Sequence, residues 1–199
     1  MLKFLPYLSL LILFGGLTSC KNQHTYEKYV KELDSLKVVV QQAVDNFKTV
    51  DSAKCIKANS KYYTYSLFLN EQVKDTVSKT IAENLQNFLS VGNGLNDYLV
   101  LRSSWLNEAN ASVAQLNDLS HDLKNGSIDE EEAVEFINTE KKQAEKIIDE
   151  LKINTESIRK HLEVYNQSLP ACEVYIKLLN GGTLPTLHQP ELKPINNEN

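Results

Sequence analysis

The stretch HDLKNGSIDEEE, residues 121–132, decides the fold, because it is either a calcium-binding loop or a corner between two helices. It has glycine, isoleucine and glutamate at the sixth, eighth and twelfth positions, as a calcium loop does. However, the first and third positions, which must supply oxygen ligands, are a histidine and Leu123. Asn125-Gly126 suits a left-handed helix C-cap, and Ser127 or Asp129 can cap a following helix. The stretch therefore predicts the corner of a helical hairpin.

Apolar residues on both sides of this corner recur every three or four positions, which is the period of an amphipathic helix. One long helix is predicted from a bend at residues 92–94 to about Lys124. The last helix is predicted from near Asp129 to Pro170, where the proline should end or kink it. Its inward positions step alternately by three and four residues, as in a coiled coil. These positions are Val134, Ile137, Lys141, Ala144, Ile148, Leu151, Thr155, Ile158, Leu162 and Tyr165.

The rest of the chain extends the helical pattern. An amphipathic helix is predicted over residues 25–49, and Asp51 and Ser52 offer cap oxygens for a second helix. Only seven glycines and five prolines occur in 199 residues, which favours helix throughout. Residues 181–199 have no period and contain three of the prolines, which predicts a flexible, disordered tail. We therefore predict an all-α protein, an antiparallel helical bundle over residues 25–180 with long, coiled-coil-like helices.

Charge and motif content argue against several function classes. The net charge is −5 and no cluster of lysine and arginine offers a phosphate-binding surface, so nucleic acid is not an expected partner. The four histidines lie far apart, and no phosphate loop, nucleophile elbow or zinc motif is present in the sequence. His121 shares a helical face with Asp118 and Asp122, but a solvated polar face explains this pattern better than a metal site. We expect no metal, no cofactor and no enzymatic activity.

Residues 1–19 have the layout of a secretory signal peptide, with a positive charge at Lys3, an apolar run and then small residues. The segment Leu17-Thr18-Ser19-Cys20 resembles the lipobox of bacterial lipoproteins. The resemblance implies cleavage before Cys20, lipidation of that cysteine with palmitate-type acyl chains, and a short linker over residues 20–24. Two or three acyl chains give stable membrane anchoring. Because no acidic residue precedes Glu27, we expect a lipid-anchored cell-envelope protein that faces the periplasm.

Three further parts of the chain, together with the lipobox, look like those of small helical lipoproteins of Bacteroidota type. They are the segment 33–36, the corner segment 115–126, and the acidic helix with Glu140 and Lys141. The resemblance brings no established activity. It does imply candidate O-glycosylation at three Asp-Ser/Thr-apolar tripeptides, for which helix capping is an equally good explanation. The tripeptides begin at Asp34, Asp51 and Asp75.

These features predict a non-enzymatic interaction or scaffold module that its anchor holds in the envelope. Its partner is expected to be another envelope protein, and self-association through the last helix stays open. The alternative is a carrier of a small apolar ligand or lipid, with Tyr62, Tyr63, Tyr65 and Phe68 as the wall of its pocket. A cavity lined by these rings favours the carrier. A filled core with exposed apolar side chains favours protein partners.

Two cysteines, Cys55 and Cys172, remain once Cys20 is lipidated. An exported protein matures in an oxidising compartment, which predicts a disulfide between them. The bond requires the chain to reverse near residues 70–75, with Asp75 capping the returning segment, so that the two cysteines come level. Without the reversal, an unbroken helix over residues 52–90 leaves both as free thiols.

Overall fold

The computed structural model describes residues 23–74 and 76–188, and this part of the chain contains five α-helices and no strand. The helices are α1 (Gln23–Lys48), α2 (Ser52–Gln72), α3 (Lys79–Ser90), α4 (Gly92–Asn125) and α5 (Glu130–Leu179). The predicted all-α fold is confirmed. Within these described residues, every helix is too short or too polar to cross a lipid bilayer.

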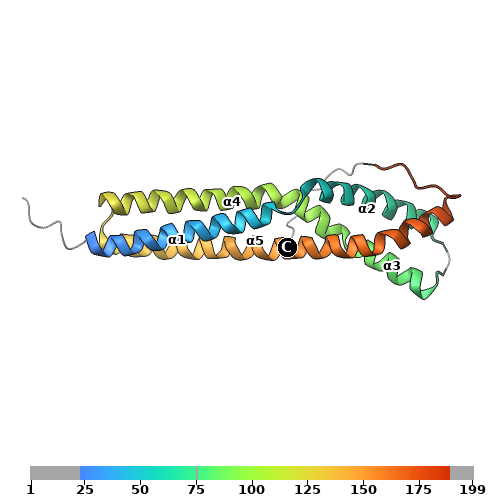
Figure 1. Cartoon of the computed structure of the whole chain (residues 1–199), viewed down its shortest axis with the longest axis horizontal. Helices are drawn as coiled ribbons and strands as arrows, with labels where there is room; N and C mark the ends of the chain where they lie inside the picture. The colour runs from blue at the N-terminus through green and yellow to red at the C-terminus, as the bar shows by residue number, and fades with distance from the viewer. Residues whose placement is uncertain (1–22, 75, 189–199) are drawn as a thin grey trace, which may run out of the picture.

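α5 is the axis of the molecule, because its 50 residues extend about 75 Å and each other helix packs against it. α1 and α4 lie along its first half, and α2 and α3 lie along its second half (Figure 1). α1, α2 and α5 run away from the α4–α5 corner, whereas α3 and α4 run back toward it. We call the two ends of the molecule the corner end and the far end. At the corner end the Tyr26 hydroxyl of α1 donates to the Ile128 carbonyl at 3.2 Å.

The corner between α4 and α5 forms as its capping residues predict. Gly126 has a φ of 63°, a left-handed conformation that glycine adopts without a steric cost. The N–H of Ser127 donates to the Asp122 carbonyl at 3.0 Å and closes α4. Asp129 accepts a hydrogen bond from the N–H of Glu132 at 3.0 Å and caps α5. This stretch is therefore a helical corner whose main residues already have structural roles.

α2 continues in the direction of α1 after a short link over residues 49–51 (Figure 1). Asp51 caps α2 as predicted, since its side chain accepts from the N–H groups of Ala53 and Lys54 at 3.0 and 3.1 Å. The guanidinium of Arg159 on α5 donates to the Thr49 hydroxyl at 2.7 Å. The link is thus fixed by its own cap and by α5.

The reversal predicted near residues 70–75 is present, because α2 ends at Gln72 and α3 begins at Lys79 and runs back. Residues 76–78 are not helical, so the returning helix starts later than predicted. The residue before α3 is Ser78, whose side chain makes no capping hydrogen bond. Asp75, the predicted cap, lies outside the described residues.

The break between α3 and α4 falls at Val91, one residue before the bend predicted at residues 92–94, which instead form the first turn of α4. The glycines of this turn are also needed for close packing. A Cβ atom on Gly92 would lie 1.9 Å from Cζ of Tyr62, and one on Gly94 would lie 2.3 Å from the imidazole of His161. The bend therefore lets side chains of α2 and α5 approach the backbone of α4.

The inward face of α5 follows most of the predicted seam. Val134 is 39% exposed, and the preceding residue Ala133 is buried in its place. Ile148 is half-buried, and the preceding residue Ile147 is buried. An α-helix has 3.6 residues per turn, so a repeat of 3.5 shifts the inward position along its length. Lys141, a polar member of the seam, forms an ion pair with Glu32 of α1. The buried members of the prediction are Ile137, Ala144, Leu151, Thr155, Ile158 and Tyr165.

Pro170 does not end α5, which continues to Leu179. Proline removes one backbone hydrogen bond and crowds the preceding turn. However, Cys172 and Ile176 in the following turns are fully buried, and their packing holds this segment on the bundle. Figure 1 shows that the axis of α5 turns over these last turns, as the predicted kink requires.

Residues 183–188 do not form the predicted flexible tail. They return along α2 in an extended conformation (Figure 1). The Ser60 hydroxyl donates to the His188 carbonyl at 2.8 Å, and the N–H of His188 donates to the Thr64 hydroxyl at 2.9 Å. Leu184 packs against the core. Polar side chains on α2 therefore hold this part of the tail, and residues 189–199 lie outside the described part.

Candidate functional site

Four aromatic rings from three helices fill the core of the far half. Phe88 of α3 is fully buried at the centre of the cluster. Its ring centroid lies 5.8 Å from Tyr62, 6.1 Å from Tyr65 and 5.9 Å from Tyr165. Centroid separations in this range are favourable for aromatic pairs. The cluster ties α2, α3 and α5 together.

The rings predicted to wall a ligand pocket occupy different environments. Tyr65 is buried, Tyr62 and Phe68 are half-buried against the core, and Tyr63 is 39% exposed. Among the described residues, none of these four side chains lines the two hollows between α2 and α5 or the hollow at the α3–α4 bend. Two of the rings are members of the core cluster around Phe88. This arrangement favours a structural role for them.

A charged group borders the aromatic cluster at Glu173 on α5. Its Oε1 accepts from Lys61 Nζ at 2.7 Å and from the Tyr65 hydroxyl at 3.0 Å. Burial raises the pKa of Glu173, but the hydrogen bonds from Lys61 and Tyr65 outweigh this effect and leave its pKa below the usual value. Burial and the neighbouring carboxylate raise the pKa of Tyr65. The group is an ionised carboxylate held by two α2 side chains, which suits helix packing rather than proton transfer.

The predicted disulfide is not formed, because Cys55 and Cys172 are both buried free thiols. Cys55 lies at the start of α2 near Tyr98, whereas Cys172 lies near Tyr65. Tyr65 is ten residues further along α2 than Cys55, which is about 15 Å of helix. A disulfide requires Cα atoms within about 7 Å. The prediction was wrong because α2 and α5 run in the same direction and the two cysteines sit at different levels.

We predict that both thiols react slowly in the folded protein. Burial raises the pKa of Cys55 to about 11 and that of Cys172 to about 12, from 9.0 for a free cysteine. At pH 8 the thiolate fraction of Cys55 is then about 100-fold lower than that of a free cysteine, and only the thiolate is nucleophilic. Reaction with an aromatic disulfide reagent should therefore be slow at pH 8 and should accelerate as the pH approaches 11.

The control for this measurement is the same protein unfolded in urea without reductant. In urea, Cys55 and Cys172 should each consume one equivalent of the reagent, which shows that neither was oxidised. Prompt reaction of folded protein that carries Cys20→Ala would contradict the buried environment of Cys55 and Cys172. An absence of reactive thiols in urea, with reaction restored by a reductant, would instead support the disulfide.

The histidines remain separate from metal-ligating partners in the described structure. Over residues 23–74 and 76–188, no three side chains of histidine, cysteine, aspartate or glutamate come together in a way that could hold a metal ion. His121 contacts Asn125 instead, with 2.8 Å between Nε2 and Nδ2. His161, which the sequence did not single out as a site residue, lines a pocket in the described part of the structure.

The pocket beside His161 lies where the α3–α4 bend meets α5. It has a volume of about 300 Å³ and combines polar side chains with the chain's single tryptophan. Trp105 is half-buried and packs edge-on against Phe47, with ring centroids 5.8 Å apart and an interplanar angle of 86°. The polar side chains are Ser90, Asn93, Asp97, Asn154, Ser157 and His161. We call this hollow the polar pocket.

One glycine-dependent contact shapes the polar pocket. Gly94 is part of its wall, and the imidazole of His161 occupies the space that a side chain at this position would take. Tyr98 lies at its buried side, where its hydroxyl accepts from Arg102 Nε at 3.3 Å. The bend at residues 92–94 was predicted only as a break between helices. The sequence signals at this site were the glycine pair, Gly92 and Gly94, and the lone tryptophan further along the same helix.

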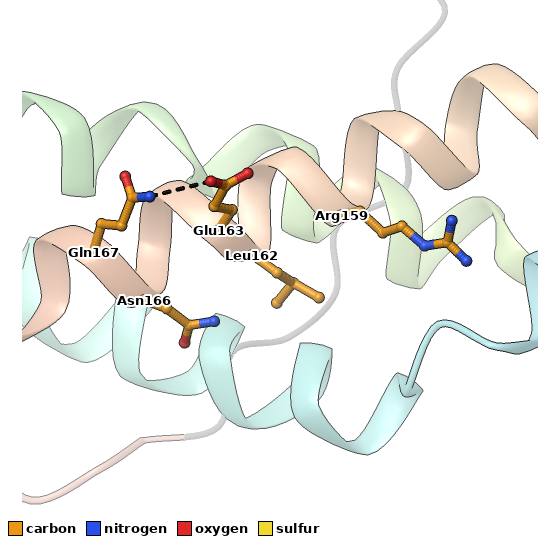
Figure 2. A pocket seen from close by; sticks show the side chains of 5 residues that line it. All are labelled: Arg159, Leu162, Glu163, Asn166 and Gln167. Atoms are coloured by element: carbon orange, nitrogen blue, oxygen red, sulfur yellow. Dashed lines mark hydrogen bonds between the residues drawn. The ribbon is translucent and has the colours of Figure 1, made fainter.

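A shallower groove runs along α5 beside α2. Figure 2 shows Leu162 and Asn166 pointing from α5 toward the neighbouring helix, with Glu163 and Gln167 on the other side of the helix axis. This part has a volume of about 460 Å³. Glu163 accepts from Gln167 Nε2 at 3.2 Å, so these polar groups already satisfy each other.

The groove continues past Leu162 into a second hollow of about 260 Å³. Its rim carries Lys54, Lys57 and Lys61 of α2. Lys61 is bound to Glu173 and Lys54 lies 3.8 Å from Asp51, so two of the three cations have partners within the chain. The groove thus offers fewer free hydrogen-bonding groups than the polar pocket.

Comparison with known proteins gives no match: no family model, curated protein or solved structure is significantly similar to this chain. The fold and its pockets therefore define the class of the protein, an elongated all-α bundle. Cys20, the predicted lipidation site, lies outside the described residues.

Proposed function

We propose that this protein is a lipid-anchored, non-enzymatic interaction module of the bacterial cell envelope that faces the periplasm. In this proposal the bundle is a spacer and its far end contacts a protein partner. α1 begins at the corner end, only three residues after Cys20. An anchor at Cys20 would therefore hold the corner end at the membrane. α5 would then extend up to about 75 Å from it.

One observation carries the proposal: the two most exposed large apolar side chains of the described residues lie together at the far end. Val174 is 70% exposed and Leu178 is 75% exposed. They are four residues apart on α5, so they lie on one face in successive turns. Apolar side chains gathered in this way favour contact with another protein. The filled aromatic core supports this function over the small-ligand carrier.

The test is a double variant, Val174→Glu with Leu178→Glu, expressed at the native level and cross-linked in intact cells. Desolvating two carboxylates at an apolar interface is costly, so a partner bound there should be recovered at least ~tenfold less. The matched control is Ile153→Glu, because Ile153 is 63% exposed but lies on the middle of α5. Circular dichroism should show that both variants keep the helical content of the wild type.

The decisive comparison is between the far-end variant and the control. Loss of a specific cross-linked protein in the far-end variant alone supports the proposal. If both variants recover the same proteins as the wild type, the far end is not the contact surface. If Ile153→Glu alone loses the partner, the contact lies on the shaft of the bundle.

A further inference from the structure

The polar pocket contains hydrogen-bonding groups that the chain itself does not use. In the described part of the protein, the side chains of Asn93, Asp97, Ser157 and His161 make no hydrogen bond or ion pair. Asn154 donates to the Glu150 carbonyl at 2.8 Å, which leaves its side-chain oxygen free to accept. The wall is mainly polar, with Trp105 and Ile158 as its apolar members, and polar groups that converge in a hollow can fix the orientation of a ligand.

The chemistry of these groups restricts the ligand. Asparagine, serine and histidine can each donate and accept hydrogen bonds, whereas the Asp97 carboxylate only accepts. A ligand that satisfies them must itself present several groups able to donate and accept, as hydroxyls do. The pocket wall contains no lysine or arginine, and it carries one carboxylate. An anionic ligand would therefore meet no opposite charge and one like charge.

The apolar part of the wall, which includes Trp105, suits a ligand with a flat ring. Trp105 presents an indole whose orientation is fixed by its edge-on contact with Phe47. A sugar ring has one face of C–H bonds that can stack on such a ring, and a rim of hydroxyls that can reach the surrounding polar groups. The volume of about 300 Å³ lies at the lower end for small-molecule sites, which suits one ring.

We propose that the polar pocket binds a neutral or amino-substituted sugar ring, free or at the end of a glycan. Trp105 stacks on the ring, and Asp97, Asn154 and His161 bind its hydroxyls. The inference is independent of the far-end surface, because the polar pocket lies between the α3–α4 bend and the middle of α5. A protein partner at the far end leaves this pocket open.

The single tryptophan makes a direct test possible, because all indole fluorescence comes from Trp105. The full-length protein, purified in a detergent without a sugar headgroup, is titrated with glucose, N-acetylglucosamine, glucosamine and glucuronate. A saturable change in fluorescence is expected with one or more of the first three sugars below ~10 mM. Glucuronate is expected to bind at least ~tenfold more weakly because of its charge.

Variants locate the binding in the polar pocket. Asp97→Ala is expected to weaken binding at least tenfold, and Asp118→Ala is the matched control, because Asp118 is an exposed aspartate on the same helix. His161→Ala provides a second pocket variant that leaves the carboxylate in place. Trp105→Phe, followed by calorimetry, should also weaken binding while keeping an aromatic ring against Phe47.

Three results would overturn the inference. The first is an absence of any saturable response to the neutral and amino sugars at ~10 mM in the folded protein. The second is tighter binding of glucuronate than of the uncharged sugars, which would place the ligand at a cationic surface. The third is equal affinity in Asp97→Ala, His161→Ala and Asp118→Ala, which would place it outside the polar pocket.

Discussion

Phe88→Ala is expected to lower the free energy of unfolding by about 3–5 kcal/mol, the usual cost of removing a buried phenylalanine ring. Phe88 is fully buried, and its ring contacts Tyr62 and Tyr65 of α2 and Tyr165 of α5. α3 has 12 residues, a length at which an isolated helix is marginal. Its attachment therefore depends on this ring and on Leu85, the other buried side chain of α3. Urea denaturation followed by circular dichroism measures the loss.

The matched control is Phe136→Ala, because Phe136 lies on α5 and is 47% exposed. This substitution should lower the free energy of unfolding by less than about 1 kcal/mol, as is usual for surface positions. Hydrogen exchange should show the Phe88 variant losing protection first in α3. Equal destabilisation by the two substitutions would mean that the aromatic cluster is not the main contact of the far half.

Features set by neighbouring residues were predictable from the sequence. The α4–α5 corner needs a left-handed glycine and a capping aspartate, and Gly126 and Asp129 supply them within four residues of each other. The cap of α2 at Asp51 is equally local. The buried face of α5 was mostly predictable, although Ala133 rather than Val134 and Ile147 rather than Ile148 are buried. Capping and periodicity need no knowledge of the distant chain.

Features that depend on the direction of a helix were not predictable. The link over residues 49–51 contains no residue that specifies whether α2 turns back or continues. Its direction depends on a distant contact, because Arg159 of α5 binds the Thr49 hydroxyl. The predicted disulfide required Cys55 to lie at the same level as Cys172. It does not form because α2 runs in the same direction as α5. The prediction of a flexible tail does not hold for residues 183–188 for a similar reason, since the groups that bind this segment lie on α2.

The polar pocket was also beyond sequence reasoning. Its polar residues belong to the α3–α4 bend, α4 and α5, and on each helix alone they look like a solvated face. They converge only because Gly94 lets His161 approach the backbone of α4. In the sequence, Trp105 lies beside the apolar stripe of its helix, which is also where a core residue would lie. The site could be recognised only once the packing of the α3–α4 bend and α4 against α5 was known.

Cys20→Ala is expected to move the protein from the membrane fraction to the soluble fraction, with nearly complete loss of lipid labelling. The proposed anchor attaches through the Cys20 thiol, and alanine cannot be acylated there. Each buried methylene contributes about 0.8 kcal/mol to membrane binding, and stable anchoring takes two chains. Removing the attachment point removes all of these chains together, so the expected change is much larger than for any substitution in the bundle.

Metabolic labelling with a palmitate analogue, followed by fractionation, measures both effects in the same cells. The matched control is Cys55→Ala, which removes a buried cysteine of α2 and should leave labelling and membrane association unchanged. The helical content of both variants should match that of the wild type, because Cys20 precedes the first described helix. Equal labelling of the wild type and Cys20→Ala would remove the basis for the anchor. The far end would then have no fixed orientation relative to a membrane, so the spacer role would fail, whereas sugar binding in the polar pocket would be unaffected.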